Sequence, residues 1–145
     1  MTTTFLLDVN VLIALVDPTH VQHDAAHDWF AQQGRKAWAT CPLTENGLVR
    51  VVGHARYPNS PGTPAAVLPL LATLRSLPGH AFWPDDISLL DTQVADSARI
   101  HGPRQITDLY LLALAVRHRG QFVTFDASVS LDAIKGAEKK HILIL

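Results

Sequence analysis

Strand-like and helix-like runs alternate along the whole sequence, and this alternation narrows the choice of fold more than any other feature. Residues 3–7 form a short β-favouring run, Asp8 follows it, and the apolar run 11–15 then predicts a buried helix. The other predicted strands are 37–40, 80–83, 121–125 and 141–145, and the other predicted helices are 24–33, 45–52, 64–76, 89–100 and 108–119. Such alternation is typical of an α/β sandwich with a mostly parallel central sheet.

Capping residues mark several of the predicted helix boundaries. Thr44 and Thr107 are the predicted N-caps of the helices that directly follow them. Thr63 and Pro64 fit the N-cap and the first position of the next predicted helix, and Pro69 predicts a kink or a late start within it.

Composition indicates an ordinary globular protein. The 145 residues are enough for one domain, predicted to span 1–145, and 48% of them are hydrophobic. The single cysteine, Cys41, cannot form an internal disulfide and no secretory leader opens the sequence, so we expect a cytoplasmic protein. No apolar run approaches the roughly 20 residues that cross a bilayer. The net charge of -1 argues against binding nucleic acid through bulk positive charge, so an RNA substrate would need local or metal-assisted contacts.

Four acidic residues stand where an α/β fold builds its ligand sites. Asp8 and Asp126 follow predicted strands, and Glu45 and Asp108 lie at the starts of predicted helices. Ligands gather beyond the carboxyl ends of the strands in open α/β sheets, so we expect the four side chains to converge in one crevice. Clustered carboxylates repel one another, and a hard divalent cation such as Mg²⁺ or Mn²⁺ would relieve that repulsion. Such a cation could also activate a water for attack on a phosphodiester.

Each acid also has a structural interpretation when taken singly. Asp8 could be a turn residue, and Glu45 and Asp108 could complement the dipoles of the helices that they begin. For the whole protein, a non-catalytic α/β binding or regulatory module is the main alternative. An aspartyl-phosphate phosphohydrolase would need a second aspartate two residues after Asp8 to exchange a proton, and Asn10 stands there instead.

Four motifs in order give the sequence a family likeness. Residues 5–15 resemble the opening of PIN domains of the VapC toxin type, and three later stretches resemble the remaining acidic motifs of that family: 42–50, 106–115 and 122–126. The resemblance implies a PIN-like three-layer sandwich and an RNA endonuclease that needs Mg²⁺ or Mn²⁺. It also implies a cognate VapB-type antitoxin and a homodimer.

The same resemblance assigns roles to individual residues. Asp8, Glu45, Asp108 and Asp126 would hold the metal and its water, while Asn10 and Thr124 would fix the orientation of the acids. Asn10 could instead be a turn residue and Thr124 an ordinary strand residue. For Arg50, a contact with RNA or antitoxin is an alternative, and a salt bridge at the helix end is the expected role.

The histidines and tryptophans are expected to be structural. His23 and His27 have a spacing that could bind zinc, but no HExxH motif accompanies them, so a capping or surface role beside the first helix is expected for these two and for His20. Trp29 and Trp38 are interpreted as core or interface aromatics and not as a base-stacking platform.

Overall fold

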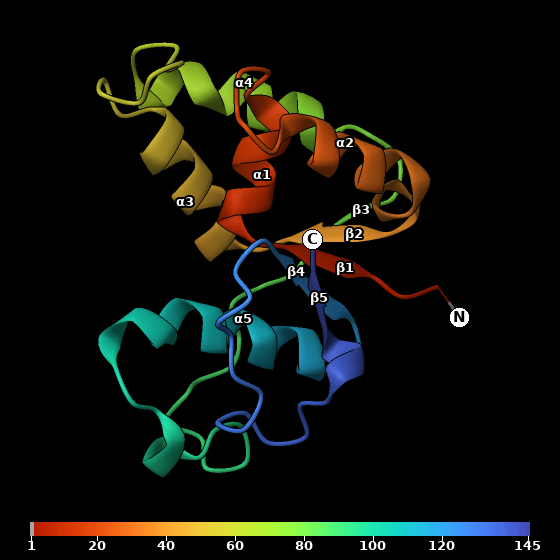
Figure 1. The fold of residues 1–145 in the computed structure, drawn as a ribbon, viewed down its shortest axis with the longest axis vertical. Helices are drawn as coiled ribbons and strands as arrows, with labels where there is room; N and C mark the ends of the chain where they lie inside the picture. The colour runs from red at the N-terminus through yellow and green to blue at the C-terminus, as the bar shows by residue number, and fades with distance from the viewer. Residues whose placement is uncertain (1) are drawn as a thin grey trace.

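The computed structural model describes residues 2–145 and contains a five-stranded sheet with helices packed on it (Figure 1). The strands are β1 Phe5–Leu7, β2 Trp38–Thr40, β3 His80–Phe82, β4 Gln121–Thr124 and β5 Ile142–Ile144. The helices are α1 Val9–Val16, α2 His23–Gln32, α3 Pro42–Val52, α4 Pro64–Arg75 and α5 Ile106–Arg117. Short 3-10 turns occur at Gly34–Lys36, Ser97–Arg99, Pro103–Gln105 and Lys139–His141.

The sheet has the strand order β3-β2-β1-β4-β5, and every pairing in it is parallel. In the centre, Leu6 of β1 stands opposite Phe122 of β4 and Leu7 stands opposite Val123. Parallel sheets are covered on both faces, which explains why the residues of these strands are mostly apolar.

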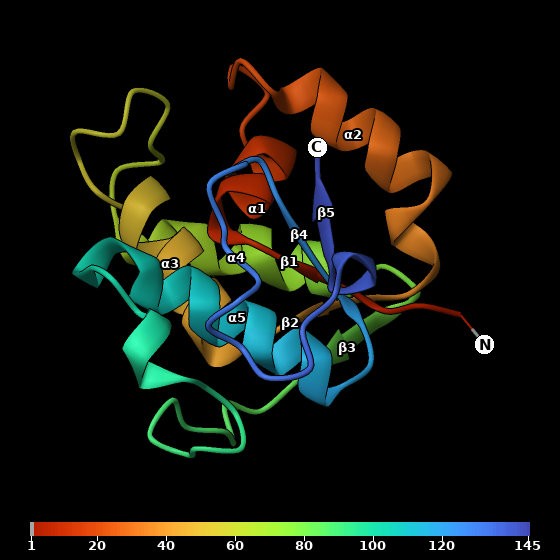
Figure 2. The same cartoon turned by 60° about the horizontal axis from the view of Figure 1, so that its bottom comes forward.

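Two hydrophobic cores lie on opposite faces of the sheet. Side chains alternate along a strand, so Leu7 and Val123 pack with the core under α1 to α4, and Leu6 and Phe122 pack with the core under α5. All four side chains are fully buried. Figures 1 and 2 show α5 on the face of the sheet opposite to α1. The predicted sandwich with helices on both faces is therefore confirmed.

The chain passes almost directly from strand to helix at the carboxyl edge of the sheet. The amide of Asp8 continues the ladder by donating to the Val123 carbonyl at 2.9 Å, and α1 begins one residue later. Helix α3 packs closely on the start of α1. Glycine at position 47 permits this approach, since a Cβ added there would lie only 2.6 Å from Cγ2 of Val9. The starts of α1 and α3 and the loop after β4 thus gather at one edge.

Two predicted N-caps are wrong by a few residues. Helix α3 begins at Pro42 with Cys41 as its N-cap, because proline is already set for the first helical position. Thr44 lies in the first turn, where its Oγ1 accepts from the Cys41 amide at 3.0 Å. Thr107 lies inside α5, which begins at Ile106 after a 3-10 turn.

Helix α4 begins as predicted. The Thr63 hydroxyl caps it by accepting from the Ala66 amide at 3.3 Å, and the helix runs through Pro69 without a late start. None of the helices in the described part of the chain has the length and apolar character needed to cross a bilayer.

The predicted helix 89–100 does not exist. The segment forms turns and the 3-10 turn Ser97–Arg99, because the side chains of Ser88 and Asp91 accept from backbone amides two residues later at 3.1 and 2.9 Å. Its backbone also pairs with the segment near residue 134 through an isolated antiparallel bridge between Ala95 and Ile134. Local side-chain hydrogen bonds and pairing with a distant backbone segment thus replace the helical hydrogen bonds.

Candidate active site

Three of the four predicted acids meet at the carboxyl edge of the sheet. Asp8 follows β1, Asp126 follows the neighbouring strand β4, and Asp108 lies in the first turn of α5. The loop after β4 passes from beside α1 toward α5 (Figures 1 and 2). The Thr124 hydroxyl contacts both the Asp8 carboxylate and the Asp126 amide, and the charges of Asp8 and Asp126 both act on the pKa of Asp108, so the three aspartates are neighbours.

Asp8 is a buried carboxylate held in a fixed orientation. Its side chain is 6% exposed, one oxygen accepts from the Val9 amide at 2.7 Å and the other accepts from the Thr124 hydroxyl at 2.7 Å. Burial raises the pKa of Asp8, and the charge of Asp126 adds to that effect, while the two hydrogen bonds oppose it. Asp8 therefore carries a charge that its surroundings only partly satisfy.

The pKa of Asp108 is also raised. Burial and the nearby charges of Asp8 and Asp126 raise its pKa to about 6, and a hydrogen bond with Asp126 acts in the same direction. The pKa of Asp126 is lowered, because the hydroxyl and the amide of Ser128 both donate to its carboxylate, at 2.6 and 2.8 Å. Asp108 is therefore more readily protonated than Asp126.

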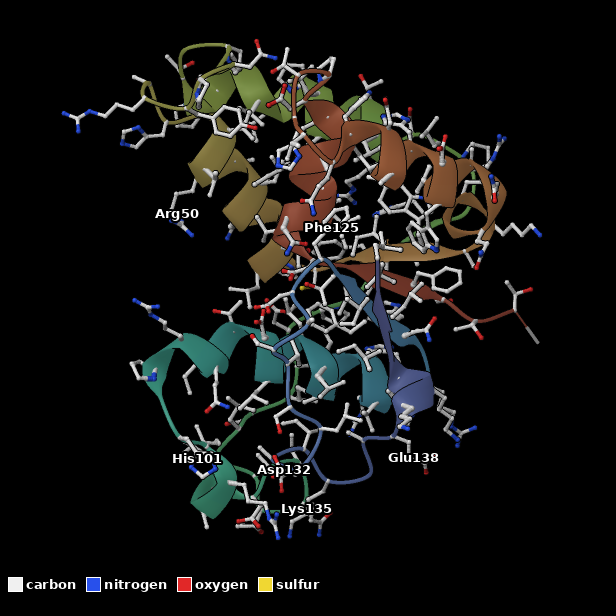
Figure 3. All side chains as sticks on the ribbon, viewed as in Figure 1. Arg50, His101, Phe125, Asp132, Lys135 and Glu138 are labelled. Carbon is white, nitrogen blue, oxygen red and sulfur yellow. The ribbon has the colours of Figure 1, made fainter. Side chains whose placement is uncertain are left out.

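The two predicted orienting residues contact the acids through one hydroxyl. Thr124 is fully buried; its Oγ1 donates to Asp8 and accepts from the Asp126 amide at 3.0 Å and from Asn10 Nδ2 at 3.2 Å. Asn10 Oδ1 accepts from the Phe125 amide at 3.4 Å, and Figure 3 shows Phe125 beside α1. These contacts fit an orienting role for both side chains.

Glu45 lies in a different set of contacts. Its carboxylate accepts from the Thr40 hydroxyl at 2.6 Å and forms an ion pair with Arg75 at 3.2 Å. The structure therefore brings together the three predicted aspartates, while the carboxylate of the predicted glutamate is engaged by groups from β2 and α4.

The donor set fits a hard divalent cation. Carboxylate oxygens are the ligands that Mg²⁺ and Mn²⁺ prefer, and the charges that raise the pKa of Asp108 come from other carboxylates, whose repulsion a cation would relieve. Within residues 2–145 no group of three His, Cys, Asp or Glu side chains is placed to hold a metal ion without rearrangement.

The sequence predictions for His23, His27, Trp29 and Trp38 are confirmed. His23 Nδ1 lies 2.7 Å from the Ala14 carbonyl and His27 Nε2 lies 2.9 Å from the Leu15 carbonyl, so both rings cap the last turn of α1. Trp38 is fully buried in the core and Trp29 is 8% exposed.

The salt bridge expected for Arg50 is wrong. Across residues 2–145 the ion pairs involve other cations, and Arg50 is exposed and projects from α3 (Figure 3). An arginine without a carboxylate partner remains available for an external anion.

The structure adds residues that the sequence analysis missed. Ser128 fixes Asp126, and its spacing two residues after an aspartate is a local turn signal that could have revealed it. Arg75 contacts Glu45 across 30 positions of sequence, and no local pattern indicates such a pair.

Comparison with solved structures shows the same fold in two proteins of low sequence identity. Mycobacterium tuberculosis VapC20, described as a toxin that cleaves the sarcin-ricin loop, matches with a TM-score of 0.60 at 14% identity, covering 86% of this chain and 91% of its own. VapBC2 from Rickettsia felis, bound to a DNA fragment from its promoter, matches with a TM-score of 0.53 at 14% identity, covering 85% and 88%. The predicted PIN-like architecture is thereby confirmed.

Comparison of sequences gives a closer relationship. The family model described as PIN domain matches residues 5–135. Ribonuclease VapC44 of Mycobacterium tuberculosis is 50% identical over 140 residues, which cover 97% of this chain and 98% of that protein. The chain therefore belongs to the PIN-domain family, in which its relatives are VapC ribonucleases.

Proposed function

We propose that this protein is a metal-dependent endoribonuclease, acting as one PIN-like domain over residues 1–145 and as the toxin of a VapBC-type toxin–antitoxin module. The observation that carries the proposal is the meeting of Asp8, Asp108 and Asp126 at the carboxyl edge of the sheet, where burial and mutual repulsion raise the pKa of the first two. The arrangement is unfavourable until a cation neutralises it, and a nuclease uses such a cation in cleavage.

The proposed roles follow from the contacts of each residue. Asp8, Asp108 and Asp126 hold Mg²⁺ or Mn²⁺, with Glu45 as the fourth acid. When bound, such a cation lowers the pKa of a water and stabilises charge on a phosphodiester. Thr124 keeps Asp8 in one orientation and, with Asn10, ties the loop after β4 to α1.

Local positive charge offers a place for the RNA backbone. Arg50 and His54 line a groove between α3 and the start of α4, together with apolar side chains such as Val49 and Leu68. We place RNA phosphates against Arg50, because a chain of net charge -1 cannot attract nucleic acid by its overall field.

A protein partner is part of the proposal. The matched Rickettsia structure is VapBC2 bound to promoter DNA, and a sequence relative of this chain is a VapC ribonuclease, which supports a partner of the same kind. We therefore propose a VapB-type antitoxin, a homodimeric toxin and a cytoplasmic setting. Exposed leucines on and after α4, namely Leu68, Leu70 and Leu77, provide apolar surface that a partner could cover.

Cleavage of RNA by the purified protein tests the activity. We expect cleavage with Mn²⁺ or Mg²⁺, none with EDTA, and loss of cleavage in Asp108→Asn, while Asp28→Asn, which changes an exposed aspartate of α2, cleaves like the unchanged protein. RNA left intact by the unchanged protein, with folding insensitive to chelator, would favour a non-catalytic module.

Growth of a host cell tests the toxin role. Expression of the chain alone should arrest growth, and Asp108→Asn should abolish the arrest. Normal growth of cells that contain active, soluble enzyme would contradict the toxin role and leave the ribonuclease activity standing.

A further inference from the structure

The ion pair of Glu45 joins the acidic edge of the sheet to the last turn of α4. Arg75 Nη1 lies 3.3 Å from Oε1 and 3.2 Å from Oε2 of Glu45, so one guanidinium nitrogen bridges both carboxylate oxygens. The Glu45 side chain is 13% exposed and that of Arg75 is 40% exposed, which places the pair at the rim and not in open solvent.

Further contacts hold both partners of the pair in place. The Thr40 hydroxyl, at the end of β2, donates to Glu45 Oε2 at 2.6 Å and lies 2.7 Å from His80 Nε2. The Arg75 guanidinium also lies over the ring of Phe82, 5.1 Å from its centre. Glu45 is thus held by β2 and α4, and Arg75 is held by β3.

These contacts contrast with those of the three aspartates. Asp8 and Asp126 accept hydrogen bonds from Val9, Thr124 and Ser128, and within residues 2–145 no ion pair includes Asp8, Asp108 or Asp126. A cation bound among the three aspartates would therefore contact carboxylates that have no paired cation, whereas the Glu45 carboxylate is already paired with Arg75.

We propose that Arg75 is a positioning residue that competes with the catalytic metal for Glu45, holding this carboxylate outside the aspartate cluster until the ion pair is broken. The proposal rests on the metal site of the proposed function. Its physical basis is that a carboxylate bridged by one guanidinium and bound by one hydroxyl must give up these partners before it can turn toward a metal.

The test measures Mn²⁺ affinity by isothermal titration calorimetry in the absence of RNA. Arg75→Met should lower the dissociation constant by about 2- to 5-fold, the range expected for losing a partly exposed ion pair. Arg75→Lys, which retains the charge, should stay near the unchanged protein. Arg99→Met, which removes a cation paired with Asp96 and Asp132, should have no effect.

Repeating Arg75→Met in the Glu45→Gln protein separates the release of Glu45 from the general effect of removing a positive charge. In Glu45→Gln there is no carboxylate for Arg75 to withhold, so adding Arg75→Met should leave the dissociation constant unchanged. Equal tightening in both backgrounds would overturn the proposal, as would weaker binding in Arg75→Met. Failure of the unchanged protein to bind Mn²⁺ at all, or binding unaffected by Asp8→Asn, would instead overturn the proposed metal site.

Discussion

Helix α1 carries a buried aspartate at each end, and the two carboxylates lie in opposite electrostatic surroundings. Asp8 precedes the helix and Asp17 follows it, and each side chain is 6% exposed. Burial opposes ionisation of both. The pKa of Asp8 is raised, whereas that of Asp17 is lowered well below its usual range.

Hydrogen-bond donors account for the difference. The carboxylate of Asp17 accepts from the Tyr57 hydroxyl, from Asn59 Nδ2 at 2.8 Å, and from the amide and hydroxyl of Thr19 at 3.0 and 2.9 Å. These donors outweigh burial and fasten the loop after α3 to the end of α1. Asp8 has two donors but faces other carboxylates. A buried acid surrounded by donors stabilises the fold, whereas one surrounded by acids leaves charge for a ligand to neutralise.

The largest expected difference between the two ends of α1 is in catalysis. Asp8→Asn should reduce RNA cleavage by roughly 10³-fold, because loss of a proposed metal ligand removes several kcal/mol of transition-state stabilisation. Asp17→Asn should cleave within about threefold of the unchanged protein at a temperature where it is folded, since Asp17 contacts no member of the aspartate cluster. Initial rates at saturating Mn²⁺ measure both, and similar losses in the two variants would break the contrast.

For stability, the larger effect is expected from Asp17→Asn and the smaller from Asp8→Asn. Asp17→Asn should lower the free energy of unfolding by about 2–3 kcal/mol, because its amide group turns a donor toward the donors of Tyr57 and Asn59. In EDTA, Asp8→Asn should change it by less than about 1 kcal/mol, since asparagine also caps helices and the repulsion is relieved. Urea unfolding followed by circular dichroism measures both values. A larger loss for Asp8→Asn than for Asp17→Asn would contradict the assignment of Asp17 as the structural residue.

The smallest effect concerns pH. Asp108 has a pKa raised to about 6 in the fold, so protonation favours the folded state below that value. Without metal, the stability of the unchanged protein relative to Asp108→Asn should fall by about 1 kcal/mol as the pH rises from about 4 to beyond about 6, after allowing for solvent screening. For Asp17 the sign is opposite, because a lowered pKa adds stability that is lost as the pH falls. A stability difference that does not change with pH across this range would show that the neighbouring carboxylates do not raise the pKa of Asp108.

Much of the fold could be predicted because its signals are local. The strand ending at Leu7, the helix that follows Asp8 and the capping of α4 by Thr63 each depend on a few consecutive residues. The capping role of His23 and His27 was also accessible, since their spacing without further ligands favours a structural position.

The sequence predictions were wrong or incomplete where contacts with residues far along the chain outweigh local secondary-structure preference. Segment 89–100 has an amphipathic sequence, yet its backbone pairs at Ala95 with Ile134 and its short polar side chains form turns. Glu45 pairs with Arg75, which lies 30 positions away, and Asp17 accepts from Tyr57 and Asn59, which lie about 40 positions away. Periodicity carries no information about such pairs.

The sequence by itself determined the alternation of strands and helices, the acids placed where those elements meet, and the family to which the motifs belong. Only the tertiary structure decided which carboxylates face one another and which face donors, because that depends on the order of strands in the sheet and on the packing of α4. Local order follows from interactions between near neighbours in the chain, whereas the charge state of a buried acid follows from every group that the fold brings around it.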